Sequence, residues 1–167
     1  MTPTPPPTLS IALYQPDIPQ NAGTILRMAA CFEMTVHIIE PCGFLLDDRK
    51  LRRAGMDYLD QVQLTRHLSW QHFIDAGPWE ADGGRLVLAT RFGATALDGF
   101  FFRPGDCIMM GRESAGVPQE VHDYCGERVF IPMREDLRSL NVAQSAAIIA
   151  FEASRQLRAQ LRIDFKI

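Results

Sequence analysis

The sequence of 167 residues predicts an α/β fold, in which one domain has a mainly parallel sheet with helices on both faces. Its strand-like segments are continuous apolar runs, such as residues 107–110, and such runs are typical of strands buried on both faces. Segments with helical periodicity alternate with these runs about five times, the order found in parallel α/β proteins. The length suits one well-buried domain and is too short for two.

The first predicted element is a strand at residues 9–14, and a loop follows it. Residues 15–21 contain Pro16 and Pro19, which are disfavoured in a helix interior and in an inner strand. Asn21 is a residue type that caps helix N-termini, so we expect a helix to begin after it. The apolar residues of that helix recur at the spacing of one helical face and are Ile25, Met28, Ala29 and Phe32.

Further strands and helices alternate along the rest of the chain. We expect strands at residues 35–39, around Val62 and Leu64, and at 85–89, 107–110 and 128–133, with helices at 45–54, 69–75 and after residue 141. Ser69 and Gly77 are residue types that start and stop the second of these helices. Residues 1–8 are predicted to be a disordered proline-rich tail, 9–160 the single domain and 161–167 a C-terminal tail.

Composition excludes several classes of protein. Apolar residues make up 47% and charged residues 22%, as in ordinary globular proteins, and the net charge of -3 restricts nucleic-acid binding to a local basic patch. Neither the cysteines nor the histidines have metal-ligand spacing, so we expect reduced thiols and no metal. No apolar run approaches the roughly 20 residues of a membrane span. The expected protein is soluble and cytoplasmic.

Four loops leave the carboxyl ends of the predicted strands, where parallel α/β sheets bind their ligands. They comprise residues 15–23, 90–93, 111–117 and 133–141. The sequence has no GxGxxG fingerprint after its first strand and no GxxxxGK(S/T) phosphate loop, which disfavours a dehydrogenase and a P-loop nucleotidase. The nucleophile elbow GxSxG is missing as well.

The loop at residues 111–116 places two glycines around one carboxylate, Glu113. Glycine lets a backbone approach a ligand closely or adopt a positive φ, although a structural turn explains the same hexapeptide equally well. Ser139 and Asn141 precede the last helix, and capping accounts for only one of the two. The two loops therefore predict opposite sides of one ligand pocket.

Asn21 and Arg27 belong to the first loop and helix, six residues apart. In a parallel sheet we expect both to face the same crevice as Glu113. A guanidinium beside a carboxylate forms an oriented, bidentate pair. For Arg27 alone, a surface salt bridge is the simpler interpretation.

Together, these motifs resemble those of the SPOUT class of RNA methyltransferases. The matching segments are residues 19–27, 111–116, 131–133 and 139–141, with further likeness at 9–14, 37–41, 47–55 and 152–157. Within the class, the chain resembles the short TrmH-like branch of the TrmL type, which methylates a 2′-hydroxyl of the tRNA wobble nucleotide. The likeness covers roughly residues 9–158. The proline-rich head lies outside it.

The resemblance implies a C-terminal trefoil knot in the α/β sheet, the SPOUT fold. It also implies a homodimer that binds S-adenosylmethionine in the knot and acts on the anticodon stem-loop of tRNA. By motif position, the cofactor-binding residues would be Ala89, Gly111, Ile131, Ser139 and Leu140. Backbone N–H and C=O groups in such loops suit an adenine edge and a ribose.

The implied reaction is direct transfer of the sulfonium methyl to a ribose 2′-oxygen, without a metal. The resemblance places Arg27 nearest the 2′-hydroxyl, as a base or an orienting group; orientation is the easier role, because an arginine pKa above about 12 disfavours deprotonation. Glu113 would orient Arg27, and Asn21 and Ser139 would complete the polar shell. One departure is Phe151, which stands where close relatives have a tyrosine.

A basic cluster at Arg49, Lys50, Arg52 and Arg53 is the candidate contact for the tRNA backbone, with a solvated helix face as the alternative. The small residues of the last helix suit either the core or a dimer face.

Other functions remain open: methylation of ribosomal RNA or of another tRNA site, and a non-catalytic RNA-binding module on the same scaffold. The sequence does not distinguish cytidine from uridine as the target.

Overall fold

The computed structural model describes residues 9–161 except 47–48, 50–52, 54–55 and 138. The predicted N-terminal tail at residues 1–8 lies outside the described residues, as do residues 162–167 of the predicted C-terminal tail and Lys50 and Arg52 of the basic cluster. The last helix includes Leu161, the first residue of the predicted C-terminal tail. Within the described part of the chain, no helix is long and apolar enough to cross a membrane.

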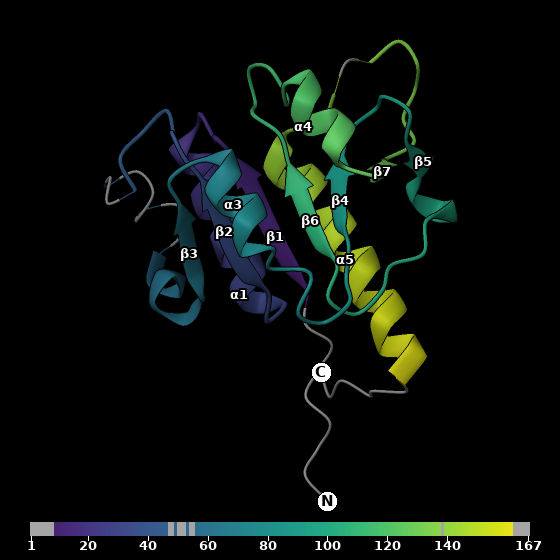
Figure 1. The fold of residues 1–167 in the computed structure, drawn as a ribbon, viewed down its shortest axis with the longest axis horizontal. Helices are drawn as coiled ribbons and strands as arrows, with labels where there is room; N and C mark the ends of the chain where they lie inside the picture. The colour runs from purple at the N-terminus through teal and green to yellow at the C-terminus, as the bar shows by residue number, and fades with distance from the viewer. Residues whose placement is uncertain (1–8, 47–48, 50–52, 54–55, 138, 162–167) are drawn as a thin grey trace, which may run out of the picture.

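A seven-stranded sheet forms the centre of the fold, in the order β3-β2-β1-β6-β4-β7-β5, with parallel pairing throughout (Figure 1). This confirms the predicted mainly parallel sheet. The strands are β1 Ser10–Tyr14, β2 Thr35–Ile39, β3 Leu64–His67, β4 Leu86–Ala89, β5 Thr95–Ala96, β6 Cys107–Met110 and β7 Glu127–Phe130.

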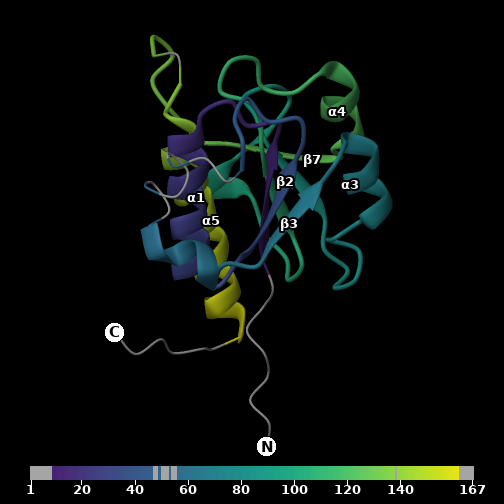
Figure 2. The same ribbon diagram turned by 90° about the vertical axis from the view of Figure 1, so that its left-hand side faces the viewer.

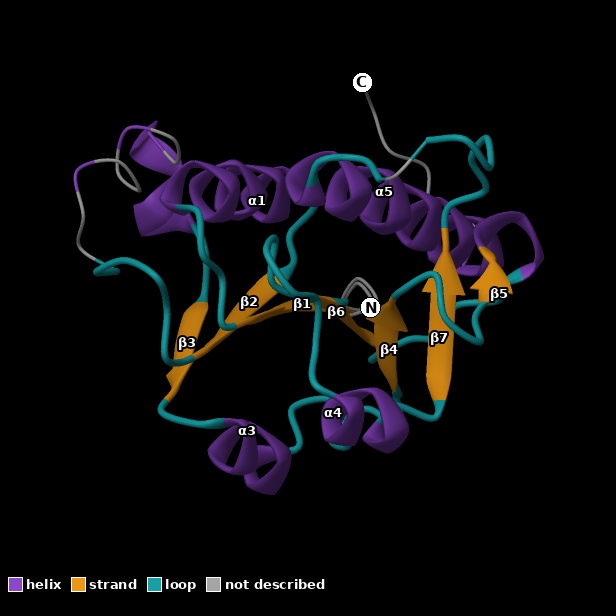
Figure 3. Cartoon of the chain, turned by 90° about the horizontal axis from the view of Figure 1, so that it is seen from above, coloured by secondary structure: helices purple, strands orange, loops and turns teal. Residues whose placement is uncertain are grey.

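Helices cover both faces of this sheet, as predicted. On one face lie α1 (Pro19–Cys31) and α5 (Val142–Leu161), which run side by side; on the other lie α3 (Trp70–Ala76) and α4 (Gln119–Tyr124) (Figures 2 and 3). The described residues also form two short 3-10 helices, η1 (Met56–Gln61) and η2 (Leu97–Gly99). Each face of the sheet has its own cluster of buried apolar side chains. Strands with cores on both faces must be apolar throughout, which explains their continuous apolar runs.

The start of α1 differs from the prediction. The helix begins at Pro19, and its N-cap residue is Ile18, without a side-chain cap hydrogen bond. Proline is tolerated there because the first N–H groups of a helix have no intrahelical partner. Asn21 therefore lies inside the first turn instead of capping it, and the loop after β1 is shorter than predicted.

Two strand predictions also need correction, and one strand was not predicted. Residues near Val62 precede the third strand, which begins at Leu64. Strand β7 ends at Phe130 instead of residue 133, so Ile131 belongs to the following loop. Strand β5, a two-residue strand at the edge of the sheet, was not predicted. By contrast, the helix after Ser69 is confirmed: the Ser69 side chain accepts a hydrogen bond from the His72 N–H, and the helix stops at a left-handed Gly77.

The strand order brings four loops to one edge of the sheet. Strands β1, β6, β4 and β7 are neighbours, and parallel pairing aligns their carboxyl ends. The order reverses between β1 and β6, since the chain runs outward from β1 to β3 before it returns to β4 on the other side. Such a reversal is where parallel α/β sheets form their ligand crevice.

The opposite edge is fastened by Arg85 and the fully buried Asp106. Arg85 donates from Nε to Asp106 Oδ1 at 3.1 Å and from a terminal nitrogen to Oδ2 at 2.7 Å. The backbone N–H groups of Arg85 and Arg103 donate to the same carboxylate. A second terminal nitrogen of Arg85 donates to Glu127 at 3.1 Å. The starts of β4, β6 and β7 are thereby joined through one guanidinium.

We predict that Asp106→Ala lowers the free energy of unfolding by about 3 kcal/mol, because it leaves Arg85 and two N–H groups without their acceptor. Urea unfolding at neutral pH measures this. The matched control is Asp136→Ala, which removes an equally bidentate Arg134–Asp136 pair whose side chains are 77% and 60% exposed. That loss should stay below about 0.5 kcal/mol. Equal losses would show that burial does not set the strength of the Arg85–Asp106 pair.

Candidate functional site

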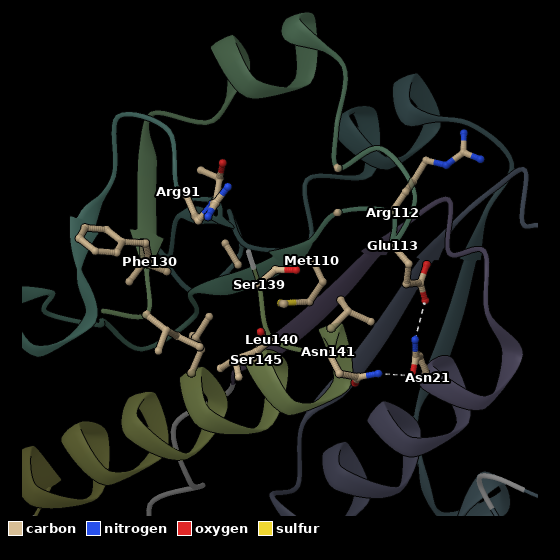
Figure 4. A pocket seen from close by; sticks show the side chains of 18 of the residues that line it. Asn21, Arg91, Met110, Arg112, Glu113, Phe130, Ser139, Leu140, Asn141 and Ser145 are labelled. Atoms are coloured by element: carbon tan, nitrogen blue, oxygen red, sulfur yellow. Dashed lines mark hydrogen bonds between the residues drawn. The ribbon is translucent and has the colours of Figure 1, made fainter. Parts of the chain in front are cut away.

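A cavity of about 440 Å³ opens at the carboxyl edge of the sheet (Figure 4). Its walls come from the start of α1, the ends of β4, β6 and β7, the segment between β7 and α5, and the first turns of α5. This volume is within the range of small-molecule sites. Segments from both ends of the sequence are therefore needed to enclose the cavity.

All five residues predicted to bind a cofactor line this cavity, namely Ala89, Gly111, Ile131, Ser139 and Leu140. Three of the four predicted catalytic residues, Asn21, Glu113 and Ser139, line it too. Their roles stay predictions, but the structure does bring together residues from four separate segments. Among the described residues there is no cluster of three or more His, Cys, Asp or Glu side chains that could hold a metal ion.

A chain of side-chain hydrogen bonds joins α1, the 111–116 loop and α5 at one side of the cavity (Figure 4). The Asn141 Oδ1 accepts from the N–H groups of Ala143 and Gln144, at 2.8 and 3.3 Å, and so caps α5. Its Nδ2 donates to Asn21 Oδ1 at 3.0 Å, and Asn21 Nδ2 donates to Glu113 Oε1 at 3.3 Å. The backbone N–H groups fix the orientation of the Asn141 side chain. Its amide nitrogen in turn fixes the orientation of the Asn21 side chain.

The 111–116 loop is closed on itself. Arg112 and Gly116 exchange two backbone hydrogen bonds of 2.9 Å. A Cβ atom on Gly111 would lie 2.9 Å from the backbone of Gly116, and Gly116 has a φ of 63°. Both positions therefore require glycine, for close approach at one and for backbone conformation at the other. The loop is a tight turn and also a wall of the cavity, so the two readings of the hexapeptide are compatible.

Asp17 fastens this loop to the loop after β1, a role that was not predicted from the sequence. Its Oδ1 accepts from a terminal nitrogen of Arg112 at 2.8 Å, and its Oδ2 accepts from the N–H and hydroxyl of Ser114 at 3.1 and 2.5 Å. The Asp17 N–H donates to Glu113 Oε2 at 2.8 Å. The hydrogen bond from Arg112, followed by those from Ser114, lowers the pKa of the Asp17 carboxyl to about 2.

The same guanidinium also reaches Gln15, whose φ of 42° is rare for a residue with a side chain. Arg112 donates to Gln15 Oε1 at 3.4 Å, next to the ion pair with Asp17. The loop after β1 is therefore held in a sparsely populated conformation by contacts from the loop after β6. The only sequence signal was the concentration of polar residues in two loops expected at the same edge.

Arg27 does not lie where we expected it. It is exposed on α1, its guanidinium carbon lies 5.1 Å from the centroid of the Tyr58 ring, and it is absent from the described residues that line the cavity. Six residues along an α-helix correspond to a rotation of about 240°, which turns Arg27 away from Asn21. Glu113 is oriented by Asn21 and the Asp17 backbone. An orienting contact from Glu113 to Arg27 stays a prediction.

The basic cluster is described only in part. Arg49 and Arg53 are helical and exposed, whereas Lys50 and Arg52 lie outside the described residues.

Phe151 is 50% exposed on α5, where its ring centroid lies 6.3 Å from that of Phe32. It is not among the described residues that line the cavity.

The lowered pKa of Asp17 predicts a pH-dependent contribution to stability. This contribution is complete above the ordinary pKa of 3.8 and is lost as the pH falls through about 2. The unfolding free energies of wild type and Asp17→Asn should therefore differ most above about pH 4 and converge towards pH 2. Urea unfolding across this range measures the difference. The control is Glu152→Gln, because the pKa of the Glu152 carboxyl is also about 2 but its partners lie on α5.

Hydrogen exchange then separates the two variants. The Ser114 amide should exchange faster in Asp17→Asn and at the wild-type rate in Glu152→Gln. Unchanged exchange in Asp17→Asn would contradict a role for Asp17 in holding the loop.

Comparison with known proteins places the chain in a family. The model of the SpoU rRNA Methylase family matches residues 8–151. The tRNA (cytidine(34)-2'-O)-methyltransferase of Beijerinckia indica is 52% identical, over 92% of this chain and 94% of that protein. The enzyme of the same name from Escherichia coli is 38% identical, over 89% of this chain and 94% of that protein.

Solved structures agree with this assignment. One, concerning the 2-OH methylation of C/U34 on tRNA, has a TM-score of 0.85 and 41% identity, over 91% of this chain and 97% of that chain. The structure of the SpoU methyltransferase AviRb of Streptomyces viridochromogenes in complex with AdoMet has a TM-score of 0.82 and 25% identity. The match covers 94% of this chain and 63% of that chain. The family match and the identity to these relatives confirm the predicted resemblance: the chain belongs to the SpoU methylase family.

Proposed function

We propose that this protein is an S-adenosylmethionine-dependent tRNA 2′-O-methyltransferase that acts on the ribose of the wobble nucleotide, position 34. The observation that supports this best is the cavity, because it joins every predicted cofactor residue to the Asn21–Glu113 pair. Relatives up to 52% identical are named as methyltransferases of cytidine 34 in tRNA, which favours tRNA over ribosomal RNA as the substrate. The proposed place of action is the cytoplasm.

The residues of the cavity fit S-adenosylmethionine. Met110, Ile131 and Leu140 offer apolar surface to an adenine ring, and the loops after β4, β6 and β7 expose backbone groups. Gly111 lines the cavity, where its backbone groups can contact a ligand. When bound, the cofactor supplies a methyl group that is already activated on a positively charged sulfur. The negative charge of Glu113, at the same cavity wall, is complementary to that sulfonium.

The chain's own residues would then position the acceptor ribose. The Asn21 and Glu113 side chains are fixed by hydrogen bonds on both sides, so their orientation requires little reorganisation during the reaction. Arg27 would orient the 2′-hydroxyl and the neighbouring phosphate, since guanidinium binds phosphate in a bidentate manner. Arg49 and Arg53 would contact the RNA backbone and make binding sensitive to salt.

The family membership also supports a trefoil knot and a homodimer as parts of this proposal. In a homodimer, Arg27 could serve the cavity of the second copy, which would explain its exposure and its absence from the cavity of its own chain. Exposed apolar side chains on α5, Ile148 at 42% and Phe151 at 50%, supply candidate apolar surface for the contact between copies.

Incubation with S-adenosylmethionine and unmodified tRNA transcripts tests the function. The expected product carries one 2′-O-methyl group at nucleotide 34, detected by mass spectrometry of nuclease fragments. A transcript with 2′-deoxyribose at that nucleotide is the control and should accept no methyl group. Arg27→Ala should lower kcat/KM by about 100-fold or more, the scale of the loss when a group that positions the nucleophile is removed. Methylation at another nucleotide, or of ribosomal RNA alone, would reject the proposed substrate.

Mixed dimers test whether Arg27 acts across the dimer. Arg27→Ala and Asn21→Ala proteins, each expected to have little activity alone, are mixed after reversible dissociation. If Arg27 serves the partner, half of the randomly formed dimers are mixed and each has one intact site, so about a quarter of wild-type activity returns. If Arg27 serves its own chain, both sites of a mixed dimer are defective and no activity returns.

A further inference from the structure

We propose that Phe92 is a stacking platform for a base of the RNA substrate other than the methylated nucleotide. Phe92 lies in the loop after β4, directly after Thr90 and Arg91, which both line the cavity. Figure 4 shows Arg91 at the cavity. Its side chain is 69% exposed. The proposal rests on the proposed function, because it names how the substrate of that site is held.

The backbone at Phe92 is fixed although its ring is exposed. His122 Nε2 lies 3.1 Å from the Phe92 carbonyl oxygen, which can only accept, so this nitrogen carries the proton. His122 Nδ1 is then free to accept from Arg128, at 3.0 Å. The Phe92 N–H donates to Thr90 Oγ1 at 3.3 Å, and the Thr90 N–H donates to Val129 at 3.0 Å. A ring on such a fixed backbone loses little conformational freedom when a base stacks on it.

The charge around this ring suits RNA. Arg91 precedes it in the loop, and Arg128 lies on the neighbouring strand β7, where its guanidinium holds His122. A base that stacks on Phe92 would bring its phosphates near these two cations. An aromatic ring beside cationic side chains is the arrangement with which proteins hold single-stranded nucleic acid, and the anticodon loop is single-stranded.

A single exposed phenylalanine is common on protein surfaces and by itself indicates nothing. Phe101 provides the comparison within the same chain. It is 78% exposed, and its carbonyl oxygen accepts a hydrogen bond from Arg85 at 2.8 Å, so it resembles Phe92 in exposure and in backbone support. It lies, however, at the amino edge of the sheet, next to Arg85 and Asp106, away from the cavity. What separates the two is that Phe92 directly follows two residues that line the cavity.

The test compares Phe92→Ala, Phe92→Trp and Phe101→Ala in binding of an anticodon stem-loop RNA and in methylation kinetics. Stacking of one base predicts that Phe92→Ala weakens RNA binding about tenfold and raises KM for tRNA similarly, with KM for S-adenosylmethionine unchanged. Phe92→Trp should bind as well as wild type, and Phe101→Ala should match wild type in every measurement.

Three outcomes overturn the proposal: wild-type RNA affinity in Phe92→Ala, a raised KM for S-adenosylmethionine instead of tRNA, or an equal loss in Phe101→Ala. Direct binding also separates this inference from the proposed function. If the wild type binds the RNA through Phe92 but transfers no methyl group, the stacking proposal stands and the enzymatic one fails. If the wild type methylates nucleotide 34 and Phe92→Ala does so equally well, the enzymatic proposal stands and the stacking proposal fails.

Discussion

The geometry of the site depends on the hydrogen bonds of Asp17. This residue joins two loops that are far apart in sequence: its carboxylate accepts from Arg112 and Ser114, and its backbone N–H donates to Glu113. Through Glu113 the fixation extends to Asn21, and through Asn21 to the cap of α5. One side of the cavity is thus a continuous hydrogen-bonded network. Networks in which nearly every member is satisfied hold side chains in one geometry, as direct methyl transfer requires.

The amino edge of the sheet contributes to stability, and the carboxyl edge carries the candidate site. At the amino edge, Arg85 and the fully buried Asp106 join three strands. At the carboxyl edge, the Arg112–Asp17 pair is partly exposed, with side chains 37% and 20% accessible. Surface ion pairs contribute little to stability. The second pair therefore matters for the shape of the cavity more than for the folding of the domain.

Local sequence signals predicted what depends on local structure. The parallel sheet followed from apolar runs, and the helix after Ser69 followed from its cap and its glycine stop. Asn21 was misassigned as a cap because Pro19 can start a helix as well as prevent one. The motifs also located half of the residues that line the cavity. The Asp17–Arg112 bond was not predictable, because it joins residues 95 positions apart and depends on how two irregular loops meet. The position of Arg27 depends on helix rotation, which a six-residue spacing leaves open until the start of the helix is known.

The most direct test of the account is a crystal structure of the protein with S-adenosylhomocysteine, the product of methyl transfer. We predict the ligand in the cavity between the 111–116 loop and the segment from Ile131 to Asn141, with its sulfur facing Asn21 and Glu113. The Asp17–Arg112 contact should be retained in that complex. Binding outside this cavity, or inside it with the sulfur turned away from Asn21 and Glu113, would contradict the account.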